Sequence, residues 1–229
     1  MKSFYAENRQ SLTPETVLAH LKKGNVRFLE NLNNHPAHLQ LANRHDDNAQ
    51  PFVTILSCSD MRMPPELIFD LGIGDVFNIR LAGNMASRNA IGNMEYTCAS
   101  LTSKLIVVLG HTNCCAVKGV CDDISFGSMN EMFEHLQLSI RRESLTPIPE
   151  RNSKNRRFVN NVAELNILYN IDHIIKSSSI VRELIENQEI GLVGAMYSGE
   201  TGKVSFMEMD VREMLGMVFS PARRNLNFF

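Results

Sequence analysis

The stretch "PFVTILSCSDMR" at residues 51–62 decides the fold of this chain. Its first part, residues 51–57, is a nearly continuous apolar run with β-branched residues, which is typical of a parallel strand covered on both faces. The run stops abruptly at Cys58, and Asp60 and Arg62 follow at once. Ligands bind outside the carboxyl ends of the strands in an open parallel sheet. The change from apolar to polar therefore predicts a functional site where this strand ends.

Two later segments repeat the pattern of the first strand. Residues 76–80, "VFNIR", and residues 104–110, "KLIVVLG", are also short and rich in β-branched residues, and helical stretches at residues 64–71 and 89–102 lie between the strands. Strands that alternate with helices in this way indicate βαβ units and a parallel sheet.

The C-terminal part of the chain adds a pair of strands. Residues 190–198 and 203–209 predict two strands joined by the turn "GETG" at residues 199–202. We therefore predict an α/β fold flanked by helices, whose central sheet is mainly parallel, with the strand order 2-1-3-4 and an antiparallel edge strand.

Three further segments have helical patterns. Residues 14–32 predict an N-terminal helix that Gly24 is expected to break or bend. Residues 128–143 predict an amphipathic helix, and residues 158–188 predict one long helix or two. Residues 145–157 are basic and rich in Pro, which is typical of a loop.

The chain is expected to form a single domain over residues 1–229. Residues 1–50 predict an N-terminal helical arm and loop, residues 51–210 the core of the domain, and residues 211–229 a C-terminal tail. No internal repeat and no low-complexity segment divides the chain further.

The composition excludes several classes of protein. The 229 residues carry a net charge of −2, so nothing suggests a nucleic-acid surface. No run of apolar residues is long enough to cross a membrane, and the N-terminus has no apolar region of the kind that a signal peptide needs. We therefore expect a cytoplasmic protein with neither nucleic acid nor membrane as a partner.

The five cysteines are expected to be reduced or bound to a metal. Their number is odd and no signal peptide accompanies them, which argues against a disulfide framework. They are Cys58, Cys98, Cys114, Cys115 and Cys121.

The third predicted strand ends like the first, with His111 directly after it and Cys114 soon after. If the strand order is 2-1-3, the ends of strands one and three are neighbours, so Cys58, His111 and Cys114 can converge. Two thiolates and one imidazole suit zinc. Asp60 or a water would fill a fourth position, and Arg62 can hold Asp60 off the metal through a bidentate bond.

Each of these residues also has a common structural role on its own. A cysteine at a strand end is usually a small buried apolar residue, and a lone histidine is more often structural than a ligand. Asp60 and Arg62 alone would form an ordinary ion pair. The joint pattern on two neighbouring strands favours the metal site over these alternatives.

The two motifs, "CSDMR" at residues 58–62 and "HTNC" at residues 111–114, resemble the C-x-D-x-R and H-x-x-C signature of the β-class carbonic anhydrases. The resemblance covers about residues 15–209. Its blocks are "QPFVTILSCSDMRMPPELIFDLGIGDVFNIRLAGNM" at 50–85, "LIVVLGHTNCCAVKG" at 105–119, "GLVGAMYSGETGKVSF" at 191–206 and "LKKGNVRF" at 21–28.

This resemblance implies a lyase that hydrates carbon dioxide reversibly to bicarbonate and a proton. Cys58, His111 and Cys114 would bind one Zn2+ per chain, and a zinc-bound hydroxide would attack carbon dioxide. Asp60 would orient this hydroxide by accepting its hydrogen bond, and Arg62 would hold Asp60. In some family members the aspartate instead binds zinc at low pH as a fourth ligand, and whether Asp60 does so is left open.

The resemblance also implies a small substrate pocket. Gln50 would donate a hydrogen bond to the substrate, and Phe77, Ala82 and Tyr96 would line an apolar wall that suits a nonpolar gas. For Phe77 and Tyr96, ordinary core packing is an equal alternative. Other members build an inhibitory bicarbonate site around a Trp, and this chain has no Trp.

Cys115 departs from the family pattern, which has Gly after the second cysteine ligand. Its backbone N–H is still expected to bind the substrate. The side chain would strain the loop if this position needs a positive φ. Alternatively, it would compete as a metal ligand, or the loop would tolerate it as a small side chain.

The resemblance further implies a homodimer or homotetramer, because pairing with another chain protects an exposed edge strand. The helix at residues 14–32 would then wrap a neighbouring subunit. Two other functions stay open, namely hydrolysis of carbon disulfide or carbonyl sulfide, and a zinc protein without hydratase activity. Iron or cobalt in place of zinc is also open, since their ligand preferences overlap.

Overall fold

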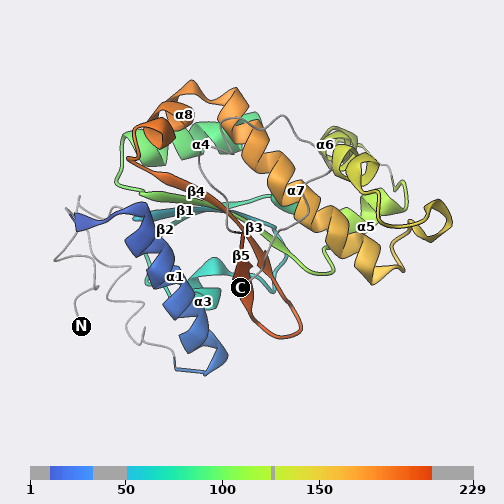
Figure 1. The fold of residues 1–229 in the computed structure, drawn as a ribbon, viewed down its shortest axis with the longest axis horizontal. Helices are drawn as coiled ribbons and strands as arrows, with labels where there is room; N and C mark the ends of the chain where they lie inside the picture. Colours follow the sequence, from blue (N-terminus) through green and yellow to red (C-terminus); the bar gives the residue numbers. More distant parts are fainter. Residues whose placement is uncertain (1–10, 33–50, 125–126, 208–229) are drawn as a thin grey trace.

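One five-stranded sheet forms the centre of the computed structural model, which describes residues 11–32, 51–124 and 127–207 (Figure 1). The strands are β1 (Val53–Ser57), β2 (Val76–Arg80), β3 (Leu105–His111), β4 (Gly191–Tyr197) and β5 (Val204–Phe206). Their order is β2-β1-β3-β4-β5, with β1 to β4 parallel and β5 antiparallel at the edge. The predicted fold class and strand order are confirmed.

Some predicted segments lie outside the described residues. They are residues 33–50 of the predicted N-terminal arm and loop, which include Gln50, the last part of the strand predicted at 203–209, and the tail at 211–229. The proposed division of the chain at residues 50 and 210 therefore stays a prediction.

Helices cover both faces of the sheet, which explains why the strands are nearly continuous apolar runs. Every residue of β1 and β3 is buried. A strand covered on both faces needs apolar side chains in both directions. One face is covered by α4 (Arg88–Ala99), α7 (Arg156–Ser177) and α8 (Ser179–Glu186), and the other by α1 (Pro14–Leu29) and α3 (Pro65–Ile68) (Figure 1).

Helix α7 packs closely against β3 and β4 because each of these strands has a glycine where the helix crosses it. A Cβ added at Gly110 would lie 2.7 Å from Ile167, and a Cβ added at Gly194 would lie 2.7 Å from the same side chain. Larger residues at these two positions would push the helix away from the sheet. The two glycines therefore fix how near α7 comes to the strands.

The structure decides one open alternative among the predicted helices and adds a helix that was not predicted. The segment at 158–188 is two helices, because Ser178 has extended backbone angles and its side chain caps α8 by accepting a hydrogen bond from Val181 N–H. Helix α6 (Met129–Arg142) agrees with its prediction. Helix α5 (Cys115–Cys121) follows the second cysteine motif and was not predicted from the sequence.

Gly24 does not break or bend α1 as expected, since the helix continues through it. A Cβ added at Gly24 would lie 1.9 Å from the carbonyl oxygen of Phe69. No flexible side chain is involved in this contact, so the backbone would have to move. The glycine therefore allows the close approach of α1 to the end of α3.

Helix α1 packs against its own chain through Val17 and Leu21, which are fully buried. The apolar pattern of residues 14–32 also predicts that Val26 lies on the buried face, but its side chain is half exposed. The neighbouring residue Asn25 is buried instead. Contact between α1 and a neighbouring subunit stays a prediction.

The side chain of Asn25 explains why a polar residue is buried there. Its Nδ2 donates to the carbonyl oxygens of Ile68, at 3.2 Å, and Gly202, at 3.0 Å. Its Oδ1 accepts a hydrogen bond from Val204 N–H at 2.9 Å. One amide therefore joins α1 to α3 and to the start of β5, with no unsatisfied polar atom left behind.

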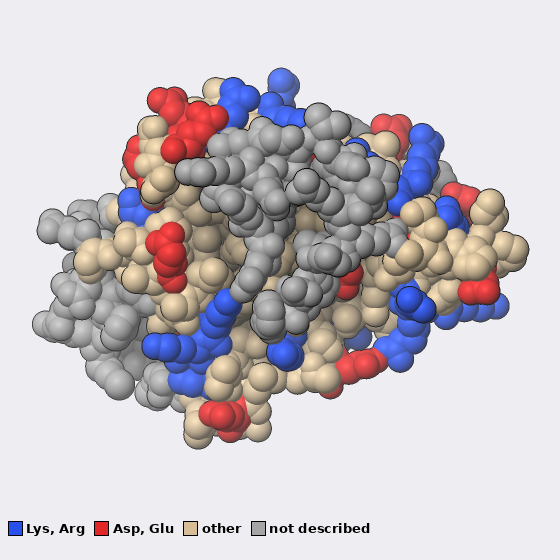
Figure 2. Space-filling view, viewed as in Figure 1, with Lys and Arg blue, Asp and Glu red and all other residues tan. Residues whose placement is uncertain are grey.

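The surface carries charges of both signs. On the face shown in Figure 2, basic and acidic side chains of the described residues are interspersed over several elements. Nucleic-acid binding needs basic residues clustered on one face. On the described part of the face in Figure 2, acidic side chains lie among the basic ones instead. Within the described residues, none of the helices is both long and apolar enough to span a bilayer.

We predict opposite effects of the same substitution in two helices. Gly24→Ala should lower the free energy of unfolding by about 1–3 kcal/mol, because the added methyl group collides with the Phe69 carbonyl. Gly92→Ala in α4 has no atom within 4 Å of the added Cβ. It should raise stability by about 0.5–1 kcal/mol, since alanine is the better helix former. Chemical denaturation measures both, and equal effects would contradict the packing argument.

Candidate metal centre

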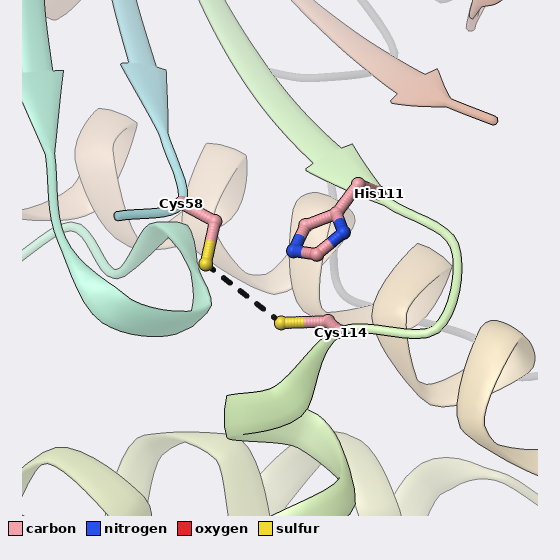
Figure 3. Close-up of side chains that lie close together, drawn as sticks. All are labelled: Cys58, His111 and Cys114. Carbon is pink, nitrogen blue, oxygen red and sulfur yellow. Dashed lines mark hydrogen bonds between the residues drawn. The ribbon is translucent and has the colours of Figure 1, made fainter. Parts of the chain in front are cut away.

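The register of β1 and β3 brings the two cysteine motifs together. Ser57 lies opposite Leu109, so Cys58 directly follows β1 at the edge where His111 ends β3. Figure 3 shows Cys58, His111 and Cys114 pointing toward one another. The two sulfur atoms are 3.9 Å apart, and the candidate ligand atoms of all three side chains lie within 4.8 Å of one another.

The imidazole of His111 has one nitrogen occupied and one available. Its Nδ1 lies 3.0 Å from the carbonyl oxygen of Thr112, so Nδ1 carries the proton and donates it. Its Nε2 is buried and has no hydrogen-bond partner among the described residues. A buried nitrogen lone pair without a partner is costly. A metal ion bound to Nε2 would satisfy it, and the Thr112 carbonyl would fix the ring.

The two thiols of the centre share one proton, and their pKa values shift in opposite directions. The hydrogen bond with Cys114 lowers the pKa of Cys58 most, burial opposes this shift, and the nearby imidazole of His111 and backbone N–H groups lower the pKa further. The shared bond with Cys58 raises the pKa of Cys114, and burial raises it further. The metal-free pair therefore keeps one proton between the sulfurs, and a metal that binds both thiolates must displace it.

Helix α5 provides donors for the second thiolate. Cys114 is the N-cap of α5, and the N–H groups of Ala116 and Val117 bond to its sulfur and lower its pKa. The first N–H groups of a helix have no partner within the helix. The unpredicted helix therefore stabilises negative charge on Cys114.

Arg62 holds the carboxylate of Asp60 at both oxygens. Its Nε donates to Oδ1 at 2.9 Å and its Nη2 donates to Oδ2 at 2.6 Å, while the backbone N–H of Arg62 also donates to Oδ1 at 3.0 Å. This arrangement holds the pKa of Asp60 well below its usual range. The Asp60 side chain is 9% exposed, whereas that of Arg62 is 68% exposed. Asp60 is therefore ionised and partly shielded from solvent.

Arg80 is a site residue that the sequence analysis missed. It is the last residue of β2, and its guanidinium donates to the carbonyl oxygens of Cys58 and Asp60. Two carbonyls of the loop after β1 are thereby tied to the neighbouring strand. The signal was present, because a charged residue at the end of an apolar strand is the pattern that pointed to Cys58 and Asp60.

The structure places two of the expected substrate-binding residues beside the centre. Ala82 begins a short 3-10 helix, Ala82–Asn84, next to Gly83, whose N–H bonds to Cys58. Cys115 is the exposed first residue of α5 and does not have a positive φ. The hypothesis that its side chain strains the loop is therefore wrong, because a helical position accepts any L-residue. Cys115 also lies outside the three-residue cluster.

Phe77 and Tyr96 are not brought to the centre within this chain. Phe77 lies opposite Thr54 in β1, about 13 Å before Cys58 at 3.3 Å per residue. Tyr96 is in the last turn of α4 and is 53% exposed. Its neighbour Thr97 bonds to Thr54, which places Tyr96 toward the opposite end of β1. Gln50, the fifth expected substrate residue, lies outside the described residues.

Comparison with known proteins gives a family match over more than half of the chain. The family model described as "Carbonic anhydrase" matches residues 53–204. "Carbonic anhydrase 2" from Mycobacterium tuberculosis is 30% identical over 194 residues, which cover 80% of this chain and 87% of that protein. A carbonic anhydrase from Synechococcus elongatus is 27% identical and covers 82% of this chain and 72% of its own length.

Solved structures have the same fold. A tetrameric β-carbonic anhydrase from Sordaria macrospora matches with a TM-score of 0.60 at 22% identity, covering 88% of this chain and 94% of that chain. The β-carbonic anhydrase CafA of Aspergillus fumigatus matches with a TM-score of 0.65 at 21% identity and the same coverage. At these identities the structures support the arrangement of strands and helices.

The cluster predicts which cysteines bind a metal. Chain stripped with a chelator should take up one zinc ion, and Cys58→Ala should weaken zinc binding by more than about 100-fold, because it removes a ligand rather than a supporting contact. Cys98→Ala is the matched control, since burial raises the pKa of Cys98 to about 11 and Cys98 lies outside the cluster. Competition with a chromophoric chelator measures both affinities. Equal losses in the two variants would contradict the assignment.

Proposed function

This chain belongs to the β-class carbonic anhydrase family, and we propose that it catalyses the reversible hydration of carbon dioxide to bicarbonate and a proton. The observation that carries the proposal is the meeting of Cys58, His111 and Cys114 beside the ionised pair of Asp60 and Arg62. The first three residues fit a metal, and the pair next to them fits the handling of a reacting water.

Zinc is the metal that fits these residues. Two thiolates and an imidazole are a usual ligand set for a zinc site that keeps one position open. A bound zinc ion lowers the pKa of a water molecule from 15.7 to about 7, which makes a nucleophile available near neutral pH. Cys58, Cys114 and the available Nε2 of His111 would hold the ion.

Asp60 orients the attacking water in this proposal. Its carboxylate stays ionised because Arg62 bonds to both oxygens. An ionised carboxylate accepts a hydrogen bond from the water and so directs the lone pair of its oxygen toward carbon dioxide. The bonds to Arg62 also keep Asp60 from rotating toward the metal. Closure of the site by Asp60 would require these bonds to break.

The substrate lies near the start of α5 in this proposal. The N–H groups at this helix end attract negative charge, which forms when carbon dioxide becomes bicarbonate. Ala82 is the expected pocket residue that lies beside the centre. Substrate contacts by Gln50, Phe77, Tyr96 and Cys115 are part of the proposal through the family resemblance.

We also propose that the chain forms a homo-oligomer. The related Sordaria macrospora protein is described as tetrameric. The described part of this chain leaves apolar side chains exposed on and near α1 and α3, including Leu29, Leu67 and Ile73. Light scattering should give a multiple of the 25.8 kDa chain mass, and a monomer at micromolar concentration would contradict this part.

Stopped-flow measurement of carbon dioxide hydration on zinc-quantified protein tests the main proposal. Turnover should rise from pH 6.5 to 9, a range that extends from about half a unit below to about two units above the expected titration near 7. Asp60→Asn should lower kcat/KM by about 10²–10⁴-fold, with the zinc content unchanged. A zinc-loaded wild type without turnover at any pH, or with faster turnover of carbonyl sulfide, would overturn the proposal.

Arg62→Ala separates the two effects of Arg62 on Asp60. Arg62 lowers the pKa of Asp60, so its removal should raise this pKa toward about 3.9. Asp60 then remains ionised at pH 7, and any loss of activity there reflects lost orientation. The loss should be nearly independent of pH between 6.5 and 9. A loss that grows steeply toward pH 6.5 would mean that protonation of Asp60 is the cause.

A further inference from the structure

Helix α7 provides no metal ligand, yet its asparagines bond to both loops that surround the ligands. We propose that Asn160 and Asn166 are positioning residues, which set the places of the His111–Cys114 loop and of the turn at Gly83 from one rigid helix. This inference rests on the metal centre of the proposed function.

Asn166 holds the turn at Gly83, which lies beside the metal centre. Its Nδ2 donates to the carbonyl oxygen of Gly83 at 2.8 Å, and its side chain is almost fully buried. Gly83 has a φ of 68°, and the short helix that contains it packs against β1, β3 and α5, the elements that carry the three ligands. The place of this turn therefore depends on a bond from α7.

Asn170 fixes the amide of Asn166. Its Nδ2 donates to Oδ1 of Asn166 at 3.1 Å, and its Oδ1 accepts from the N–H of Ala86 at 2.7 Å. With Oδ1 of Asn166 occupied in this way, the Nδ2 of that residue faces Gly83. The loop is therefore held at both Gly83 and Ala86, by two asparagines on the same side of α7.

Asn160 holds the second loop. Its Oδ1 accepts a hydrogen bond from the N–H of Asn113 at 2.9 Å. Asn113 has a φ of 61°, in the left-handed region, and lies between His111 and Cys114. The chain reverses at this residue so that the imidazole and the second thiol face the same point. A bond that fixes Asn113 therefore fixes the separation of two ligands.

The helix itself is well suited to this role. Its inner face is buried against β3 and β4, with Ile167 against Gly110 and Gly194. Asn160 and Asn166 are about 9 Å apart along the axis at 1.5 Å per residue. One rigid helix that makes both hydrogen bonds holds the site in place better than separate hydrogen bonds made within each of the two loops. Supporting contacts of this kind usually change metal affinity by about 10–100-fold when removed.

The two asparagines use opposite chemistry, which gives a sharp test. Asn160 uses an acceptor oxygen, which aspartate retains, so Asn160→Asp should keep its zinc affinity near the wild-type value. Asn160→Leu removes the acceptor and should weaken zinc binding by about 10–100-fold. Asn166 uses a donor, which aspartate lacks, so Asn166→Asp should weaken zinc binding by at least as much. Asn166→Ala tests the same donor if the aspartate variant does not fold.

The readouts are zinc affinity by chelator competition and the absorption spectrum of the cobalt-substituted chain. The thiolate-to-cobalt bands report the geometry of the ligands and do not require activity. Asn25→Ala is the matched control, because Asn25 is another buried asparagine with hydrogen bonds to three residues, but it belongs to α1 and bonds to none of the loops around the ligands. It should lower the unfolding midpoint and leave the zinc affinity and the cobalt bands unchanged.

The outcomes separate this inference from the proposed function. Variants of Asn160 and Asn166 that lose stability but keep wild-type zinc affinity and cobalt bands would show a merely structural role and overturn the inference. Equal losses of zinc affinity in Asn160→Asp and Asn166→Asp would also overturn the inference. A wild type that binds cobalt but does not hydrate carbon dioxide would overturn the proposed function alone. A wild type that binds neither ion would overturn both.

Discussion

The parallel pairing of β1 with β3 is the constraint on which the centre depends. A slip of one residue would turn each side chain to the other face of the sheet and carry Cys58 away from Cys114. The apolar pattern does not prevent such a slip, because both strands are apolar on both faces. Particular contacts have to fix the register. Thr54 is one, since its buried hydroxyl bonds to Thr97 at 2.8 Å and Ser103 at 2.9 Å.

The centre also depends on hydrogen bonds that stabilise buried negative charges. A thiolate or carboxylate loses solvation when it is buried, and the loss has to be offset by hydrogen bonds or an opposite charge. At Cys58 and Cys114 some of the donors are backbone N–H groups, which cannot be removed by changing a side chain. At Asp60 the donor is the guanidinium of Arg62. The centre therefore has a permanent backbone component and a replaceable side-chain component.

The sequence predicted the strands and the ligand motifs because these depend on local apolar runs and on the residues directly after each run. The strand order is not a local property, so the convergence of the ligands could be predicted only on the condition that strands one and three are neighbours. It did not predict α5, whose seven residues are too few for a helical period to appear. It also placed Val26 rather than Asn25 on the buried face of α1, since the three bonds of Asn25 come from distant segments. Arg80 had a local signal that was not used. The asparagines of α7 had none, because their partners become neighbours only in the folded chain.

The continuity of α7 limits how relatives of this chain can vary in length. A residue inserted into an exposed connection lengthens a loop and leaves the helices in place. A residue inserted between Asn160 and Asn166 would rotate one relative to the other by about 100°, since a helix has 3.6 residues per turn. One of the two would then face away from its loop. Insertions and deletions should therefore accumulate in the loops of the family, while the spacing within this helix stays constant.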